Sequence, residues 1–430
     1  MRLLLERALL PHGVADDVEV LIEGGRFVDV RPGLRDSAAT RVDGLTIPGL
    51  ANCHSHAFHR ALRGHTQAER GSFWTWRERM YAVAERLTPD SYYALARATY
   101  AEMVSTGITT VGEFHYLHHG PGGTAYDDPN AMGKALIAAA TDVGLRITLL
   151  DTCYLASGFG TPPEGVQQRY SDGTAEAWAA RVADLSESPT SRIGAAIHSV
   201  RAVPADQLST VVAAADGGPL HVHLSEQVAE NEACQAAHRC TPTELLHDHG
   251  VLHRATSAVH ATHLTESDID LLGAAQTTSC FCPTTERDLG DGIGPSRALH
   301  GAGSRLSLGS DSHAVIDLFE EMRALEMNER LRTQQRGHWS GAELVAAATR
   351  HDSLGWSDVG QIAIGQRADL VNLATDSPTT AGTGASYESV AMATSAYDVR
   401  RVWIDGVRRL DGDRAQVGAD LTKAIEEVRR

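Results

Sequence analysis

The chain has 430 residues, of which 22% are charged and 42% hydrophobic, as in a globular protein rather than a disordered or fibrous one. Its formal net charge of −17 argues against nucleic acid or an anionic membrane as a partner. No apolar run approaches the length needed to cross a bilayer. The six cysteines, without a secretory signal, indicate free thiols in a reducing compartment, so we expect a cytoplasmic protein.

Short apolar, β-rich runs recur along the chain, and segments with helical periodicity separate them. The runs cover residues 45–56, 108–116, 146–155, 193–201, 219–226, 257–264, 277–284 and 306–313. Segments 93–107 and 205–218 both end in glycine and are typical of the intervening helices. Eight strands that alternate with helices predict an α/β fold, a parallel sheet closed into a (β/α)8 TIM barrel.

The sequence pattern at the two ends of the chain differs from that in the middle. Residues 1–47 and about 366–414 read as short strands separated by turn signals. We therefore predict a small β-sandwich domain formed by both chain ends. The barrel, residues 48–365, would be inserted between its halves, and residues 415–430 would form a C-terminal helix.

Ionisable or metal-binding side chains lie at the ends of six of the eight predicted strands. They are His54 with His56, His115 with Tyr116, His198 with Arg201, His223 with Glu226, His260 with His263, and Asp311. A single histidine of this kind would usually be a satisfied core or surface side chain. In a barrel, however, the working residues lie at the C-terminal ends of the strands. The set as a whole therefore predicts an active site at that end.

The spacing within this set indicates a metal site. His54 and His56 are two residues apart, so on a strand both point to one face and can converge on one ion. His223 is nearer its strand end than His221, which we expect deeper in the barrel. Asp311 closely follows a glycine at the end of the last strand. Three imidazoles and one carboxylate suit zinc, or a similar ion such as iron or manganese.

Two further pairs of residues limit this site. His260 and His263 are three apart and face opposite ways on a regular strand, so at most one serves the site. The only lysines are Lys134, in a predicted helix, and Lys423, in the C-terminal tail. Barrel hydrolases with two metals commonly bridge them through a carboxylated strand lysine, and none is available here. We therefore expect one divalent metal ion, with zinc as the first candidate.

Several motifs together resemble the deaminase-like branch of the amidohydrolase superfamily. They are 48-PGLANCHSHAFHRALRG-64, 221-HVHLSE-226, 259-VHATHL-264 and 308-LGSDSH-313. Within that superfamily, four further stretches of the chain resemble the formimidoylglutamate deiminases: 71-GSFWTWRERMY-81, 112-GEFHYLHH-119, 195-AAIHSVRAV-203 and 282-CPTTERDLGDGI-293. The resemblance covers nearly the whole chain. It implies hydrolysis of N-formimino-L-glutamate to N-formyl-L-glutamate and ammonia, a step of histidine degradation.

The resemblance also implies roles for single residues. The metal ligands of the family match His54, His56, His223 and Asp311. The catalytic groups match Glu226, His260 and Asp311. The substrate-binding positions match His59, Arg77, Tyr116, His198, Arg201 and Glu226. His59 replaces the glutamine of the best-known members, and both side chains can donate a hydrogen bond. In the family the counterpart of Arg77 can act from the neighbouring subunit, which implies a homodimer.

A dicarboxylate substrate would explain two arginines of this acidic chain. Arg201 lies just past the fourth predicted strand, and Arg77 lies inside the tryptophan-rich 73-FWTWR-77. A guanidinium can hold a carboxylate through two hydrogen bonds, and nearby indoles would shield it from water. The other interpretation of Arg77 is a surface ion pair.

Other functions remain open at the level of sequence. A guanine or S-adenosylhomocysteine deaminase of the same branch would call for an apolar slot more than for two arginines. An imidazolonepropionase-like hydrolase would also bind a carboxylate. A metal-free scaffold used for binding or assembly would have lost ligands, whereas every expected ligand is present here.

Overall fold

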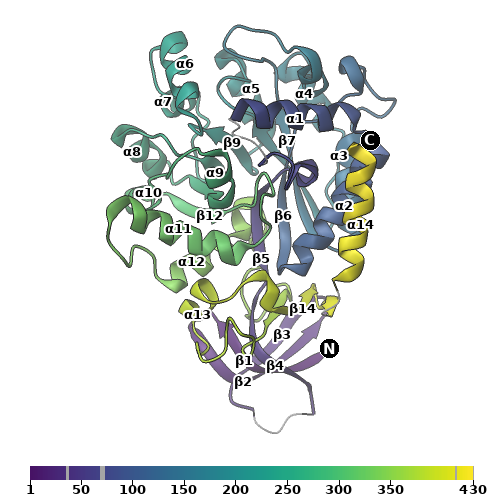
Figure 1. Ribbon diagram of the computed structural model, residues 1–430, viewed down its shortest axis with the longest axis vertical. Coiled ribbons are helices and arrows are strands. Elements are labelled where there is room, and N and C mark those ends of the chain that lie inside the picture. Colours follow the sequence, from purple (N-terminus) through teal and green to yellow (C-terminus); the bar gives the residue numbers. More distant parts are fainter. Residues whose placement is uncertain (35–37, 68–72, 412–413, 430) are drawn as a thin grey trace.

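The computed structural model describes residues 1–34, 38–67, 73–411 and 414–429 of the chain. An eight-stranded parallel sheet is surrounded by helices, and a separate seven-stranded sheet lies at one end of it (Figure 1). This arrangement confirms the predicted barrel with a small β domain.

The barrel strands overlap the eight predicted runs one by one. Their bounds are β5 Leu50–Ser55, β6 Ile108–His115, β7 Arg146–Cys153, β8 Ser191–Ile197, β9 Leu220–Leu224, β10 Thr256–His260, β11 Thr278–Phe281 and β12 Arg305–Leu308. Every residue of β6 and of β7 is buried. A parallel strand of this kind is covered on both faces, by the barrel interior on one side and by the helices on the other, which explains the continuous burial.

The barrel closes where its first and last strands meet. Neighbouring strands pair in chain order from β5 to β12. Ser55 and Asp311 form a parallel bridge beyond the end of β12. The backbone N–H of Asp311 donates to the His54 carbonyl at 3.0 Å, and the N–H of His56 donates to the Asp311 carbonyl at 3.3 Å. Closure therefore brings the first and last predicted site residues together through the backbone itself.

Helices occupy the connections between the strands, as predicted. The α-helices are α1 Phe73–Arg86, α2 Pro89–Ser105, α3 Ala131–Val143, α4 Ala175–Val182, α5 Leu208–Ala215, α6 Val228–His238, α7 Pro242–Asp248, α8 Glu266–Ala274, α9 Pro283–Leu289, α10 Ser296–Ala302, α11 Leu318–Thr333, α12 Gly341–Ala348, α13 Tyr387–Met392 and α14 Ala415–Arg429. The 3₁₀ helices are η1 Ala57–Leu62, η2 Pro121–Gly123, η3 Gly165–Tyr170, η4 Ala205–Gln207, η5 His351–Leu354 and η6 Ala396–Asp398. Helix α2 shows why such segments begin where they do, because the Thr88 side chain accepts from the Ser91 N–H and Pro89 occupies the first turn.

The seven-stranded sheet is built from both ends of the chain. Its strands are β1 Arg2–Leu10, β2 Gly13–Glu23, β3 Arg26–Arg31, β4 Thr40–Pro48, β13 Leu370–Leu373, β14 Val399–Ile404 and β15 Val407–Asp411. Strand β4, from the first end, pairs antiparallel with β13, from the second. The two ends are thus held together by main-chain hydrogen bonds, and the chain enters the barrel directly from β4 into β5.

A buried ion network joins this sheet to the floor of the barrel, the end at which the barrel strands begin. Arg146, the first residue of β7, donates to both carboxylate oxygens of Asp369, at 2.8 and 3.2 Å. It also donates to Asp405 in the turn between β14 and β15, at 2.9 Å. Arg146 and Asp369 are almost fully buried, at 1% and 2% exposure. The guanidinium additionally lies over the Trp356 ring.

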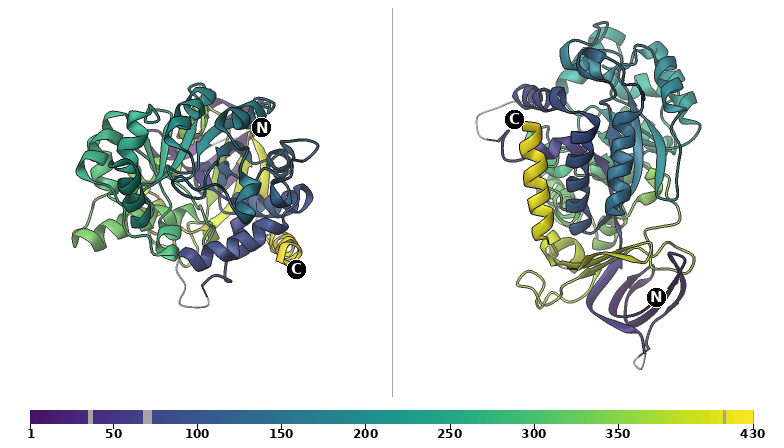
Figure 2. Two further views of the ribbon diagram at one scale, coloured as in Figure 1. Left: turned by 90° about the horizontal axis from the view of Figure 1, so that it is seen from above. Right: turned by 90° about the vertical axis from the view of Figure 1, so that its right-hand side faces the viewer.

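Helix α14 corresponds to the helix expected at the C-terminal end, and it lies along the outside of the barrel beside α2 (Figure 2). Among the described residues, the search for a helix long and apolar enough to span a membrane finds none.

Candidate active site

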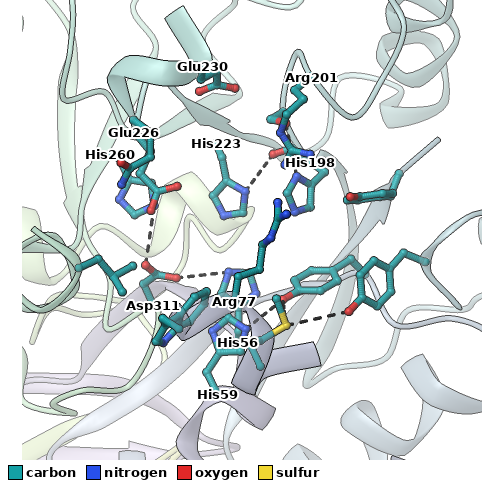
Figure 3. A pocket seen from close by; sticks show the side chains of 18 of the residues that line it. His56, His59, Arg77, His198, Arg201, His223, Glu226, Glu230, His260 and Asp311 are labelled. Carbon is teal, nitrogen blue, oxygen red and sulfur yellow. Dashed lines mark hydrogen bonds and ion pairs between the residues drawn. The ribbon is translucent and has the colours of Figure 1, made fainter. Parts of the chain in front are cut away.

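The four residues predicted to hold a metal lie together at the end of the barrel where the strands finish, here called the mouth. His54 and His56 come from the end of β5, His223 from β9, and Asp311 from the loop after β12. Asp311 Oδ1 lies 3.4 Å from His54 Nε2 and 3.3 Å from His56 Nε2. The Nε2 atoms of His54 and His223 are 3.1 Å apart. The structure therefore brings all four side chains to one point (Figure 3 shows three of them).

The hydrogen bonds of the imidazoles fit a cation at this point. The Nδ1 of His56 donates to the Phe114 carbonyl, and the Nδ1 of His223 donates to the His198 carbonyl, both at 2.9 Å. A neutral ring that donates through Nδ1 carries its lone pair on Nε2, as a metal ligand requires. Burial lowers the pKa of His54 to about 3, so that ring is neutral. Converging lone pairs beside a carboxylate are a donor set that a divalent ion such as zinc accepts.

Asp311 is held as an anion, and its backbone adopts a conformation that is rare for residues other than glycine. Burial by itself would raise the pKa of Asp311, but its contacts with the imidazoles of His54 and His56 and the charge of His260 outweigh burial and hold it well below its usual range. Its backbone has φ 41°, and His260 (φ 68°) and Ser225 (φ 50°) at neighbouring strand ends are also left-handed. Such backbone strain is typical of functional sites, where it fixes the direction of a side chain.

A second group, rich in carboxylates, surrounds His260. Its Nε2 lies 3.8 Å from Glu226 Oε1 and 3.7 Å from Asp311 Oδ2, and its Nδ1 lies 3.4 Å from Glu286 Oε1. Burial alone would lower the pKa of His260, but the three carboxylates raise it well above its usual value. Burial also raises the pKa of Glu226, against the opposing charge of His260. The group thus holds a cationic imidazole beside a carboxyl group that is ready to carry a proton.

These groups open into a cavity of about 310 Å³. The predicted substrate-binding residues all line it: His59, Arg77, Tyr116, His198, Arg201 and Glu226. Arg77 comes from α1, which lies across the mouth, and Arg201 from the loop after β8 (Figures 1 and 3). Arg77 lines the cavity of its own chain, so a single chain brings both arginines to the same space as Asp311. Aromatic rings from Trp76, Tyr81, Tyr154 and Tyr170 complete the wall.

His59 is bound within the wall as well as lining it. Its Nε2 lies 2.9 Å from the Tyr116 hydroxyl, and its ring packs edge-on against Trp76, with 5.1 Å between the ring centroids. Burial lowers the pKa of His59 well below its usual value, so the ring is neutral. His59 can therefore orient Tyr116, or offer one neutral hydrogen bond to a ligand.

The remaining histidines fall as the spacing predicted. His263 turns away from the mouth, and its Nε2 donates to the Asp291 carbonyl at 2.8 Å, so of this pair only His260 lines the cavity. His221 lies deeper in the barrel and contacts the Ser353 carbonyl at 3.4 Å.

A third cluster could hold a metal by geometry but is better described as an internal ion network. His115 and His118 lie close to the Asp151 carboxylate, and all three side chains are buried. Both oxygens of Asp151 already accept from the Arg181 guanidinium, at 2.8 and 3.0 Å, and one also accepts from Trp178 Nε1 at 2.9 Å. A fixed cation in that position repels a second one, so we do not assign a metal to this cluster.

Sequence reasoning missed two carboxylates of the site. Glu286, on α9, contacts His260 and accepts from the Cys282 backbone N–H at 2.9 Å. Glu230, in the first turn of α6, lines the cavity four residues after Glu226. Neither follows a strand directly, so the rule that located the other residues passes over them. The acidic stretch 286-ERDLGD-291 was the available signal for Glu286.

Fold and site together define a barrel hydrolase with a place for a divalent metal. Residues 45–409 match the model of the amidohydrolase family, and the chain belongs to that family. A crystal structure of an amidohydrolase from Brucella melitensis superposes with a TM-score of 0.92 at 32% identity, covering all of both chains.

Two curated relatives indicate the range of reactions in this part of the family. Formimidoylglutamate deiminase of Pseudomonas aeruginosa is 36% identical over 390 residues, which is 87% of this chain and 86% of that protein. A 5-methylthioadenosine/S-adenosylhomocysteine deaminase of Pelotomaculum thermopropionicum is 28% identical over 377 residues, 84% of this chain and 81% of that protein. The predicted resemblance is therefore confirmed, and the relatives share hydrolytic removal of an amino or imino nitrogen.

Proposed function

We propose that this protein hydrolyses N-formimino-L-glutamate to N-formyl-L-glutamate and ammonia, as a step of histidine degradation. The observation that carries the proposal is the meeting of Arg77 and Arg201 with Asp311 in one cavity. Two guanidinium groups suit a substrate with two carboxylates, whereas a purine base such as guanine offers no carboxylate to either of them. The 36% identity to formimidoylglutamate deiminase supports the same substrate.

The residues that would hold one divalent ion, with zinc as the first candidate, are His54, His56, His223 and Asp311. The chemistry that such an ion supplies when bound is to lower the pKa of a water molecule from 15.7 toward about 7. Asp311 would accept the proton of the attacking water, because its carboxylate is ionised and buried at the mouth.

Glu226 would deliver the proton to the leaving nitrogen. As the water oxygen bonds to the formimino carbon, the imino nitrogen gains basicity and takes a proton from Glu226, whose pKa is raised by burial. The proton that Asp311 took from water then passes to the same nitrogen, the C–N bond breaks and ammonia leaves, while the hydroxyl returns its proton to Glu226 and becomes the formyl oxygen. Overall, two protons pass from water to nitrogen.

His260 would serve both carboxylates during these transfers. It lies between them, with its Nε2 3.8 Å from Glu226 Oε1 and 3.7 Å from Asp311 Oδ2. A cationic imidazole in that position stabilises whichever carboxylate is ionised and the negative charge that develops on the reacting centre. Glu286, on the opposite side of the ring, keeps it charged and in place.

Arg77 and Arg201 would each hold one carboxylate of the substrate. The Arg201 guanidinium is oriented by the Ser157 carbonyl, to which it donates at 2.8 Å, and by Tyr154. Arg77 lies over the Tyr81 ring at 5.4 Å. His59, Tyr116 and His198 would contact the substrate between these two points.

The decisive experiment is a coupled ammonia assay on N-formimino-L-glutamate with metal-loaded protein. We expect turnover that a chelator removes and zinc restores. Guanine and S-adenosylhomocysteine are the comparison substrates, and Arg201→Met is the matched variant, which should raise KM for the formimino substrate far more than it lowers kcat. Faster ammonia release from either purine compound would contradict the proposal.

Two further expectations belong to this proposal and can be measured independently. We propose a cytoplasmic homodimer, to be tested by fractionation of cells and by light scattering of the purified protein. Because Arg77 reaches the cavity within one chain, we expect the dimer to support α1 from outside rather than to complete the site. A monomer with full activity would remove the dimer from the proposal and leave the reaction intact.

A further inference from the structure

Glu230 is a carboxylate of the cavity that the proposed reaction does not use. It lies in the first turn of α6, four residues after Glu226, which precedes that helix, and both side chains line the cavity (Figure 3). Among the described residues, its buried Oε1 has no hydrogen-bond partner. Unpaired carboxylate oxygens are costly in a buried wall, so this position calls for a functional explanation.

Other charged and titratable groups line the same cavity as Glu230 or lie beside it. They include Arg77 and Tyr81 on α1, Tyr154 after β7, Arg201 after β8, Glu226 after β9 and His260 at the end of β10, with Cys234 one turn further along α6. Burial, helped by the charge of Glu226, raises the pKa of Glu230 to about 7 against the opposing effects of Arg201, the Ser225 backbone N–H and His260. The group can therefore be neutral or charged at ordinary pH.

A carboxylate ligand on Arg201 would change that balance. It would place a second negative charge on the guanidinium that now partly stabilises the Glu230 anion, and two carboxylates at one site cannot both remain ionised without cost. A proton on Glu230 removes the repulsion and turns its carboxyl group into a hydrogen-bond donor toward the ligand.

We propose that Glu230 is a specificity-determining residue that couples binding of a ligand carboxylate at Arg201 to uptake of one proton at the Glu230 carboxyl group. The inference rests on the proposed function, because it takes a carboxylate to be the group that Arg201 receives. Its consequences follow from linkage. Binding is strong while Glu230 is protonated and weakens as pH rises through its pKa in the free protein, by up to tenfold for each further pH unit.

The test is titration calorimetry of the metal-loaded protein with glutarate, a dicarboxylate that the enzyme cannot hydrolyse. Repeating the titration in buffers of different ionisation enthalpy counts the protons exchanged. We expect uptake of a substantial fraction of one proton at pH 7.5, and affinity at pH 8.5 about tenfold to thirtyfold lower than at pH 6.

Two variants separate Glu230 from other groups that titrate in this range. Glu230→Gln has a neutral side chain at every pH, so it should bind glutarate at pH 8.5 about as tightly as the natural protein does at pH 6, without proton uptake. Glu232→Gln removes the same charge from an exposed position two residues along α6, and it should keep both the pH dependence and the uptake.

Three results would overturn the inference. They are proton release on binding, a pH dependence that persists in Glu230→Gln, and absence of glutarate binding at pH 6. The ammonia assay separates this from the main proposal. Glutarate binding with proton uptake but no turnover of the formimino substrate would refute the proposed reaction alone, and turnover without uptake would refute the role of Glu230 alone.

Discussion

The floor and the mouth of the barrel handle buried charge in opposite ways. On the floor, Arg146 meets Asp369 and Asp405, so opposite charges from the barrel and the small sheet satisfy one another within the chain. At the mouth, like groups gather instead. The Nε2 atoms of His54 and His223 are only 3.1 Å apart, and the carboxylates of Glu226 and Glu286 lie beside the His260 ring. The floor therefore stabilises the fold, whereas the mouth is arranged to bind groups that are not part of the chain.

This difference predicts how substitutions at the two ends should behave. Groups at the mouth are held in place against their own repulsion, so removing one should cost activity and little stability. Groups on the floor neutralise one another's charge. Removing one should therefore leave a buried charge unpaired and cost stability, while the site stays intact.

The largest effect on activity is expected for Asp311→Asn. The amide keeps the shape but can neither accept the proton of water nor bind a cation as a carboxylate does, so kcat should fall by about 10³-fold or more. Metal content should fall with it, while the midpoint of thermal unfolding should stay within a few degrees of the natural protein. A large loss of stability at unchanged kcat would reverse the assignment of the mouth.

The matching change on the floor is Arg146→Met. It leaves Asp369 buried without its cation, and we expect a loss of about 3–5 kcal/mol in the free energy of unfolding. The kcat of the folded protein should stay within about twofold. Chemical denaturation followed by tryptophan fluorescence measures the first quantity, and the ammonia assay the second.

Arg192→Met is the control for that change. Arg192 also lies over the Trp356 ring, at 4.4 Å, but its ion-pair partner Glu187 is exposed. Its replacement should therefore cost about 1 kcal/mol or less. An equal loss in both variants would show that stacking on Trp356, rather than the buried ion network, holds the floor together.

Glu286→Gln should have an intermediate effect that depends on pH. Burial pulls the pKa of His260 down, and the carboxylates of Glu226, Glu286 and Asp311 raise it well above its usual value. Removing one carboxylate lets burial lower that pKa, so the imidazolium is lost at a lower pH and the alkaline limb of the kcat profile moves toward acid. We expect a measurable displacement of that limb toward lower pH, recorded as kcat against pH in the ammonia assay.

The control for this shift is Glu320→Gln, an exposed position paired with Arg287. Its pH profile should coincide with that of the natural protein. An unchanged alkaline limb in Glu286→Gln would mean that His260 does not need its charge during turnover.

Sequence reasoning located the residues whose position follows from a strand. His54, His56, His223 and Asp311 stand at a strand end or within three residues after one, and parallel strands in a closed barrel all finish at one mouth. Knowing the strands was therefore enough to know that these side chains meet.

The residues that were missed depend on contacts that no local pattern encodes. Glu230 and Glu286 lie on helices, where most carboxylates face solvent, and only the tilt of α6 and α9 toward the mouth makes them part of the site. Arg146 and Asp369 are 223 residues apart; Arg146 begins β7 of the barrel, and Asp369 immediately precedes β13 of the small sheet. Each reads as an ordinary charged residue until the small sheet is placed under the barrel.

The smallest effect is expected for His59→Gln, and it tests how strictly the mouth specifies its polar groups. His59 is neutral and buried, its Nε2 pairs with the Tyr116 hydroxyl, and among the described residues its Nδ1 has no hydrogen-bond partner. A glutamine amide can replace the single bond to Tyr116, so kcat/KM should change less than about threefold. His59→Leu removes the bond and leaves the buried hydroxyl with only its weak contact to the Met80 sulfur, at a cost of about 1–3 kcal/mol in stability or substrate binding. If His59→Gln instead lost more than tenfold in kcat/KM while Tyr116→Phe lost little, the imidazole would contact the substrate directly through Nδ1, and the mouth would be as exacting in its neutral groups as in its charged ones.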